Sequence, residues 1–283
     1  MSFGPNPWQQ TSWDWRAAGN FIGGGIGTGL ILACAVFAAP VSAWTSNWLL
    51  LLALALIGAG LTCVWLEIGR PMRALHVFFN PKTSWMSREA FVGLLLFPCG
   101  LLALLGLKGW IWPTTALALI FLYCQSRMLP AARGIVAWRS GVLIPLMFAT
   151  GLCEGFGAFV LLGGLHGRVT DSVILCFAAT LLARSVVWYL YHESVQASLV
   201  PRARNALDQA GHLLNSAGTL LPMLLAAVAL ALSDGMVQTM LLALAGAGAV
   251  LTGANLKYTL ITRAGFNQGF ALTKIPVRGV KAS

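Results

Sequence analysis

Runs of apolar residues, each close to twenty residues long, follow one another along most of this 283-residue chain. A helix needs about 20 apolar residues to cross the hydrocarbon core of a bilayer. Eight runs are therefore predicted as membrane-spanning helices, with the approximate bounds Ala17–Ala38, Trp48–Trp65, Ala90–Leu105, Thr114–Cys124, Gly141–Leu162, Ser172–Tyr191, Ser216–Leu232 and Val237–Leu256. The third and fourth runs have the least defined ends, and the fourth can extend from Trp110 to Met128.

Composition agrees with this interpretation. Charged residues make up 9% of the chain, against roughly 25% in a soluble domain, and the mean hydropathy is +0.79. The sequence predicts an all-α integral membrane protein with eight transmembrane helices arranged as two four-helix bundles. Within one transmembrane domain, 1–283, the expected parts are an N-terminal interfacial segment (1–16), a first bundle (17–138), a second bundle (139–262) and a tail (263–283).

Positive charge is unevenly distributed among the predicted connections. With eight helices, both termini lie on one side, together with the connections after the second, fourth and sixth helices. These segments carry most of the Lys and Arg residues, whereas the opposite side receives Lys108 and Arg168. Because cytoplasmic connections are enriched in Lys and Arg, both termini are predicted to be cytoplasmic. The net charge of +10 is thereby assigned to topology and not to nucleic-acid binding.

The connection between the second and third helices concentrates polar residues. It runs from Glu67 to Glu89 and contains Arg70, Arg73 and Trp85. A pocket that is half apolar and half charged suits a ligand with an apolar body and a redox-active head, such as a quinone. Quinone reduction needs protons as well as electrons, and a carboxyl group beside hydrogen-bond donors can exchange them. The alternative is an interfacial cluster of salt bridges that fixes the loop.

Two charged residues lie deep within predicted spans. Glu154 is in the fifth span and Arg184 is in the sixth. Charges within a span are costly and indicate a functional site. The pair is predicted to form a step in a proton path, and the alternative is a structural polar pair.

Metal centres are not expected on this chain. The six cysteines lie in apolar runs without a Cys-x-x-Cys pair, whereas iron–sulfur clusters need thiolates at short spacings. The four histidines lie in connections or at helix ends, whereas the axial ligands of a membrane haem usually lie within the spans. No iron–sulfur cluster, haem or other metal site is therefore predicted.

Two segments of the charged connection resemble a family signature. Glu67-Ile68-Gly69-Arg70-Pro71-Met72-Arg73 and Asn80-Pro81-Lys82-Thr83-Ser84-Trp85-Met86-Ser87-Arg88-Glu89 are similar to the connection in NrfD/DmsC-type membrane anchors. These anchors are the quinone-interacting subunits of complex iron–sulfur molybdoenzymes. The glycine-rich first span after Trp13-Asp14-Trp15 and the segment Arg133-Gly134-Ile135-Val136-Ala137-Trp138 support the resemblance. The opening Ser2-Phe3-Gly4-Pro5-Asn6-Pro7-Trp8-Gln9-Gln10 is most similar to anchors of sulfite- or phenylacetyl-CoA-oxidising complexes.

The resemblance implies a subunit of the bacterial inner membrane that carries no catalytic centre of its own. It implies an iron–sulfur subunit docked on one face and a molybdopterin catalytic subunit beyond it. Electrons would pass between the iron–sulfur subunit and menaquinone or ubiquinone, with quinone reduction favoured.

The resemblance also implies site residues. Glu67 stands where the dimethyl sulfoxide reductase anchor has a histidine, while Arg73 and Glu89 match that anchor's arginine and glutamate. Glu67 and Glu89 are the predicted proton-exchanging groups. The predicted quinone-binding residues are Asn20, Arg70, Arg73, Trp85 and Tyr123. The predicted partner-docking residues are Arg16, Lys82, Arg88, Arg127, Arg133, Arg139 and Arg202.

Two other functions remain open from the residues. The first is a small transporter or permease with a midplane site at Glu154 and Arg184, although transporters often show broken helices in matching halves and no matched pair is evident here. The second is a structural anchor without a quinone site.

Overall fold

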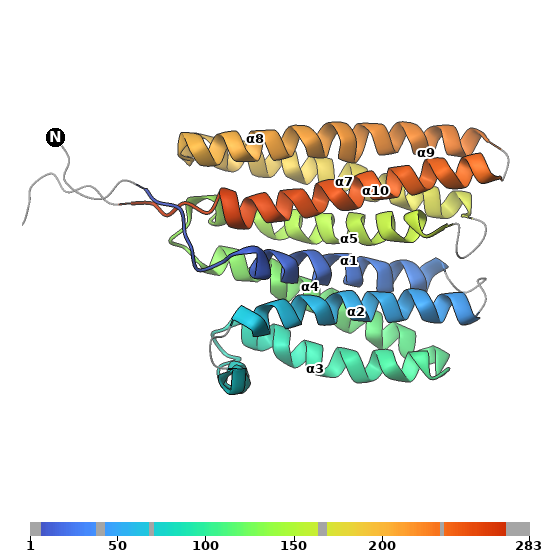
Figure 1. Ribbon diagram of the computed structural model, residues 1–283, viewed down its shortest axis with the longest axis horizontal. Coiled ribbons are helices and arrows are strands. Elements are labelled where there is room, and N and C mark those ends of the chain that lie inside the picture. Colours follow the sequence, from blue (N-terminus) through green and yellow to red (C-terminus); the bar gives the residue numbers. More distant parts are fainter. Residues whose placement is uncertain (1–6, 38–42, 68–70, 164–168, 233–234, 270–283) are drawn as a thin grey trace, which may run out of the picture.

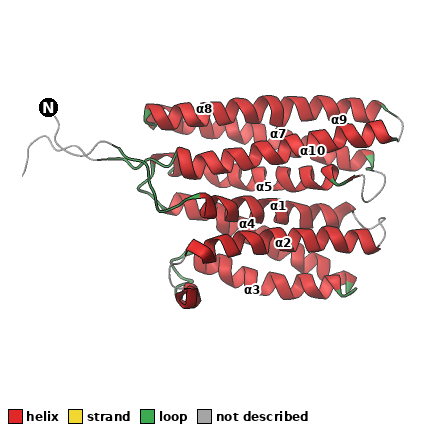
Figure 2. Cartoon of the chain, viewed as in Figure 1, coloured by secondary structure: helices red, strands yellow, loops and turns green. Residues whose placement is uncertain are grey.

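The computed structural model describes residues 7–37, 43–67, 71–163, 169–232 and 235–269, and within these ranges the chain is all-helical (Figure 2). The long helices lie side by side with their axes nearly aligned (Figure 1). Their bounds are α1 (Trp15–Phe37), α2 (Ala43–Glu67), α3 (Trp85–Leu104), α4 (Ile111–Ala131), α5 (Leu143–Leu161), α7 (Asp171–Val195), α8 (Pro201–Asn215), α9 (Leu221–Ala231) and α10 (Met236–Tyr258).

Shorter helical segments connect or extend these helices. The 3-10 helices are η1 (Pro71–Phe79), η2 (Lys108–Trp110), η3 (Val136–Trp138) and η4 (Gln196–Ser198). Two π-helical turns, η5 (Ser216–Leu220) and η6 (Thr259–Arg263), continue α8 and α10. Helix η1 exposes Leu75 and Phe79 beside the end of α2, as expected for a segment that lies at a membrane surface.

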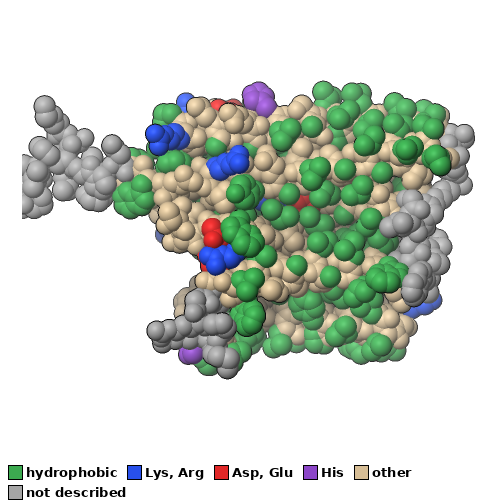
Figure 3. All heavy atoms as spheres, in the orientation of Figure 1, with side chains coloured by type: hydrophobic (Ala, Val, Ile, Leu, Met, Phe, Trp, Pro, Cys, Tyr) green, Lys and Arg blue, Asp and Glu red, His purple; other side chains and the backbone are tan. Residues whose placement is uncertain are grey.

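In the part of the chain that the structure describes, seven helical segments are long and apolar enough to cross a bilayer. They are Trp15–Phe37, Asn47–Glu67, Trp85–Leu104, Leu143–Leu161, Asp171–Ser198, Pro201–Ala231 and Met236–Arg263. The outer surface of the bundle is also rich in apolar side chains (Figure 3), and Leu94, Leu182, Leu244 and Leu251 are each at least half exposed. A bilayer solvates such a surface, whereas water does not. The chain is thus a multi-pass membrane protein.

Helix α4 covers the fourth predicted run but is not among these seven segments. It has 21 residues, and several of its polar side chains are buried, among them Thr114, Gln125 and Ser126. These polar side chains lower the mean hydropathy of α4. They are buried against other helices, so they do not contact lipid. The eighth span therefore stays a prediction.

The seventh span begins earlier than predicted. The apolar run suggested Ser216–Leu232, but the helix starts at Pro201 and is continuous through the π-turn to Ala231. Helix α8 buries Ala203, Leu207, Ala210 and Leu214, which lie on one face at helical spacing. Its other face is polar, so the mean hydropathy of α8 is low and does not indicate a span.

Helix α1 lies at the centre of the molecule and packs against α2, α4, α5 and α10. Its glycines allow these contacts. A Cβ atom at Gly155 of α5 would lie 2.1 Å from the Gly29 carbonyl carbon, and one at Gly27 would lie 2.5 Å from the Ala53 oxygen of α2. The glycine run of α1 thus allows neighbouring helix backbones to approach closely.

The segments at the two ends of the described chain meet. The Gln10 amide donates to the Gly265 carbonyl at 2.8 Å, and the Asn267 amide donates to the Trp8 carbonyl at 3.0 Å. The connection after α4 joins them, since the Gln268 amide donates to the Gly134 carbonyl at 3.2 Å. We call this side of the bundle the terminal end; η1 also lies there (Figure 1).

Candidate functional site

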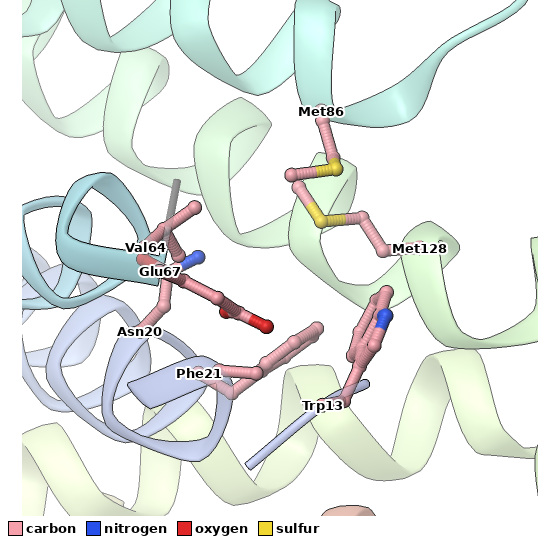
Figure 4. A pocket seen from close by; sticks show the side chains of 8 residues that line it. Trp13, Asn20, Phe21, Val64, Glu67, Met86 and Met128 are labelled. Atoms are coloured by element: carbon pink, nitrogen blue, oxygen red, sulfur yellow. The ribbon is translucent and has the colours of Figure 1, made fainter. Parts of the chain in front are cut away.

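A pocket opens at the terminal end between α1, α2, α3 and α4. Its volume is about 130 Å³, and Figure 4 shows most of its lining side chains: Trp13, Ala17, Asn20, Phe21, Val64, Glu67, Met86 and Met128. Apolar and aromatic groups form most of the wall. The Glu67 side chain extends from the last residue of α2 toward Phe21 (Figure 4). The pocket is therefore an apolar space with one carboxylate at its edge.

Asn20 connects this pocket to a second carboxylate. Its Nδ2 atom donates to Glu89 Oε1 at 3.2 Å, and its backbone carbonyl accepts from Gln125 Nε2 at 3.0 Å. All three side chains are buried, with Glu89 at 4% exposure. The Asn20 Oδ1 and Gln125 Oε1 atoms are buried without a hydrogen-bond partner among the described residues. An unsatisfied buried acceptor beside a pocket is available to a ligand that donates a hydrogen bond.

The rim of the pocket is held by an ion pair. Arg16 Nη2 lies 2.8 Å from Asp14 Oδ2, and Arg16 Nη1 donates to the Leu66 carbonyl at 3.1 Å. The hydrogen bond from Arg16 lowers the pKa of Asp14 from its usual value. This pair links the start of α1 to the last turn of α2, which fixes the residue before Glu67.

The structure brings together Asn20, Glu67 and Glu89, which the sequence predicted for one site. Arg70 lies outside the described residues. Arg73 lies within η1, but its side chain is not among those described. Neither arginine can therefore be placed relative to the pocket.

Trp85 and Tyr123 lie elsewhere. They do not line the pocket at Glu67; their rings contact each other edge to face, with centroids 5.9 Å apart. Trp85 precedes Met86, and successive residues of a helix point about 100° apart, so the two side chains enter different spaces. Two arginines stack on the Trp85 ring, with Arg88 Cζ 4.1 Å and Arg127 Cζ 4.7 Å from its centroid.

The predicted docking residues all belong to segments at the terminal end. Lys82, Arg133, Arg139 and Arg202 are exposed, and Arg16, Arg88 and Arg127 are half-buried. Arg88 donates to the backbone carbonyls of Pro81 and Lys82, at 2.9 and 2.7 Å. Arg16 is the member of this set that forms an ion pair with a described carboxylate. The other six thus present cationic groups that no described carboxylate neutralises.

Glu154 pairs with Lys257 and not with Arg184. Glu154 Oε2 lies 2.5 Å from Lys257 Nζ, both side chains are fully buried, and Lys257 also donates to the Phe21 carbonyl at 2.9 Å. Arg184 instead donates to the carbonyls of Ala249, at 2.9 Å, and Gly218. The buried arginine thus binds backbone oxygens of α10 and the π-turn, and it does not complete the Glu154 pair.

Lys257 is the polar residue that the sequence did not point to. It follows directly after the predicted end of the last span at Leu256, so the sequence placed it among the cations on the side that carries both termini. Helix α10 and its π-turn continue to Arg263, which places Lys257 inside the bundle. Gly25 of α1 makes room, because a Cβ atom there would lie 2.2 Å from Lys257 Nζ. A helix that extends beyond the apolar run is the feature that would have indicated a buried position for Lys257.

No protein-family model matches the chain, and no curated protein matches it either. The resemblance to the NrfD/DmsC-type anchors therefore remains a prediction from the segments around Glu67 and Glu89.

Proposed function

We propose that this chain is the membrane anchor and quinone-reactive subunit of a molybdopterin oxidoreductase complex. Electrons would pass between an iron–sulfur subunit at the terminal end and a membrane quinone, menaquinone or ubiquinone, in the direction of quinone reduction. The observation that supports the proposal is the pocket between α1 and α4, where Glu67 lies at the edge and Asn20 leads to the buried Glu89.

The residues of the pocket fit the head group of a quinone. At about 130 Å³ the pocket is smaller than the 300–1,000 Å³ that encloses a whole drug-sized ligand, so it suits a head group with its tail outside. The side chains of Phe21, Met86 and Met128 would contact the ring, and the unsatisfied Asn20 Oδ1 would accept a hydrogen bond from a reduced head group.

The two carboxyl groups would handle protons. A bound quinone supplies a two-electron carrier that also takes up two protons. Glu67 is half-buried at the membrane surface, so its carboxyl group can exchange protons with water and present one to the pocket. Glu89 lies behind Asn20, which orients it through the Nδ2 hydrogen bond and separates it from water. The chain thereby provides an outer and an inner proton-exchanging group.

A second part of the proposal concerns topology and docking. We propose that α4 is the eighth span, that both termini are cytoplasmic in the bacterial inner membrane, and that the terminal end faces the partner subunit. The exposed cations Lys82 and Arg202, together with Arg16 and Arg88, would meet acidic groups of that partner. Glu154 remains a candidate for a proton path, since its partner Lys257 also donates to the backbone carbonyl of Phe21, a residue of the pocket; the role of Arg184 in that path stays a prediction.

A transporter is less well supported. Its proposed midplane site relied on Glu154 and Arg184, but each of these side chains already has a partner within the protein, Lys257 in one case and backbone carbonyls in the other. These contacts give the two charges a structural role without a transported solute.

The test is quinone turnover by the complex purified through a tag on this chain. Glu89→Gln removes the inner proton-exchanging group, and the expected loss in turnover is about 100-fold. Asn20→Ala removes a hydrogen-bonding group, and affinity for a quinone analogue should fall roughly 5-fold. Glu193→Gln is the matched control, because Glu193 is exposed on α7 and far along the chain from the pocket. Wild-type turnover of Glu89→Gln at saturating quinone, together with unchanged binding by Asn20→Ala, would contradict the proposal.

A further inference from the structure

A second, larger hollow at the terminal end is rich in arginine. It has a volume of about 780 Å³ and is lined by Trp85, Arg127, Pro130, Ala131, Arg133, Arg139 and Ile144. We call it the arginine pocket. No acidic side chain lines it, and none of its three arginines forms an ion pair with a carboxylate in the described part of the chain.

Neutral groups hold the side chains of Arg127 and Arg139 in place. Arg139 Nε donates to the Arg133 carbonyl and Arg139 Nη2 donates to Gln268 Oε1, both at 2.5 Å. Arg127 Nη1 lies 3.5 Å from the Tyr123 hydroxyl, and its guanidinium stacks on Trp85. These contacts orient the side chains but leave three like charges in one hollow without compensation. An anion placed there would relieve their mutual repulsion.

An apolar groove continues from the arginine pocket into the membrane region. It lies between α4, α5 and α7, has a volume of about 460 Å³, and is lined by Tyr123, Ile144, Pro145, Phe148, Ala149, Leu152, Thr180, Ala183 and Val187. Ile144 lines both spaces, and Tyr123 lies one helical turn before Arg127. From Ile144 to Leu152 the groove runs about 12 Å along α5, most of the ~15 Å depth of one bilayer leaflet.

We propose that the arginine pocket and the apolar groove together bind an anionic phospholipid. The phosphate lies among Arg127, Arg133 and Arg139, and an acyl chain lies along α5 in the groove. Basic pockets between membrane helices on the cytoplasmic side bind such head groups. A docked acidic protein would use the cations but would not need an apolar groove that leads away from the surface. The site is separate from the quinone pocket and does not depend on its function.

The test is lipid retention measured by native mass spectrometry of the full chain, purified with any subunits that accompany it. The protein is incubated with dioleoyl-phosphatidylglycerol or with dioleoyl-phosphatidylcholine, and glycerol phosphate serves as a head group without acyl chains. Wild-type protein should retain phosphatidylglycerol in preference to phosphatidylcholine. Glycerol phosphate should bind far more weakly than phosphatidylglycerol.

Two kinds of variant separate the pocket from the groove. The triple variant Arg127→Gln, Arg133→Gln, Arg139→Gln should lower phosphatidylglycerol retention roughly 100-fold, given about a fivefold step for each arginine. The control variant Lys108→Gln, Arg204→Gln, Arg263→Gln removes the same charge from exposed positions outside the pocket, and should retain the lipid. Ala149→Trp fills the groove without changing charge and should lower retention at least tenfold.

Each contrary result has a distinct meaning. Equal retention of the two phospholipids, or equal loss in the triple variant and its control, would overturn the proposal. Binding of glycerol phosphate as tight as that of phosphatidylglycerol, with no effect of Ala149→Trp, would mean a free-anion site. Loss of an accompanying subunit from the triple variant, with lipid retention unchanged, would mean a protein-docking surface.

Discussion

The ion pair between Glu154 and Lys257 is the most deeply buried charged contact among the described residues. Both side chains are at most 1% exposed, and Glu154 Oε1 lacks a hydrogen-bond partner. A buried pair gains little net stability, because removing two charges from water costs about as much as their attraction returns. Removing one partner is different, since the other charge is then left buried and uncompensated.

Lys257→Met should therefore reduce the free energy of unfolding by about 3–5 kcal/mol. The double variant Glu154→Leu, Lys257→Met should recover most of this loss, because neither charge remains. The measurement is unfolding by SDS in mixed micelles, with Lys108→Met as the control at an exposed position. A double variant no more stable than Lys257→Met alone would show that the pair is needed for more than its charge balance.

The crossing of α1 and α5 determines how the two halves of the chain fit together. At Gly155 a Cβ atom would lie within 2.3 Å of three backbone atoms of Gly29 and Leu30. Backbone cannot move aside as a flexible side chain can, so the helices would have to separate. Such separation would also disturb the cavity for Lys257 beside Gly25.

Gly155→Ala should accordingly reduce the free energy of unfolding by at least about 2 kcal/mol, the range expected for overpacking of a close contact. Gly141→Ala is the matched control, since a Cβ atom there has no neighbour within 4 Å. Size-exclusion chromatography in detergent provides the first measurement, followed by SDS unfolding. Equal stability of the two variants would mean that α1 and α5 lie farther apart than described.

The sequence predicted most helices because apolar runs report directly on contact with lipid. The sequence could not predict the ion pair between Lys257 and Glu154, because the hydropathy of one helix does not show which of its faces packs against which neighbouring helix. The amphipathic α8 was missed for a related reason: its buried Leu207 and Leu214 alternate with polar residues that lower the average.

The residues of the candidate site were likewise predicted only in part. Asn20, Glu67 and Glu89 were predicted together and lie together, because each is the polar residue near an apolar helix end that faces the interior. Trp85 and Tyr123 were predicted for the same pocket, but the rotation of α3 and α4 turns Trp85 toward the arginine pocket and Tyr123 toward the apolar groove. A rotation of one residue along a helix decides such a placement, and spacing alone does not reveal it.

At the scale of the molecule, the seven apolar helical segments found among the described residues and the gathering of cations at the terminal end indicate a multi-pass protein with one strongly basic face. That face carries the opening of the proposed quinone pocket and the proposed docking residues. A soluble electron-transfer partner bound there would lie next to Glu67 and Asn20. The proposed function therefore depends on such a partner being present.

The decisive experiment is purification of the tagged chain from its native membranes in a mild detergent, with mass spectrometry of the proteins and cofactors that accompany it. The proposed function predicts stoichiometric recovery of an iron–sulfur protein and a molybdopterin-containing protein. Recovery of the intact, stable chain by itself, without any metal-containing partner, would contradict the anchor function and return attention to Glu154, Lys257 and Arg184.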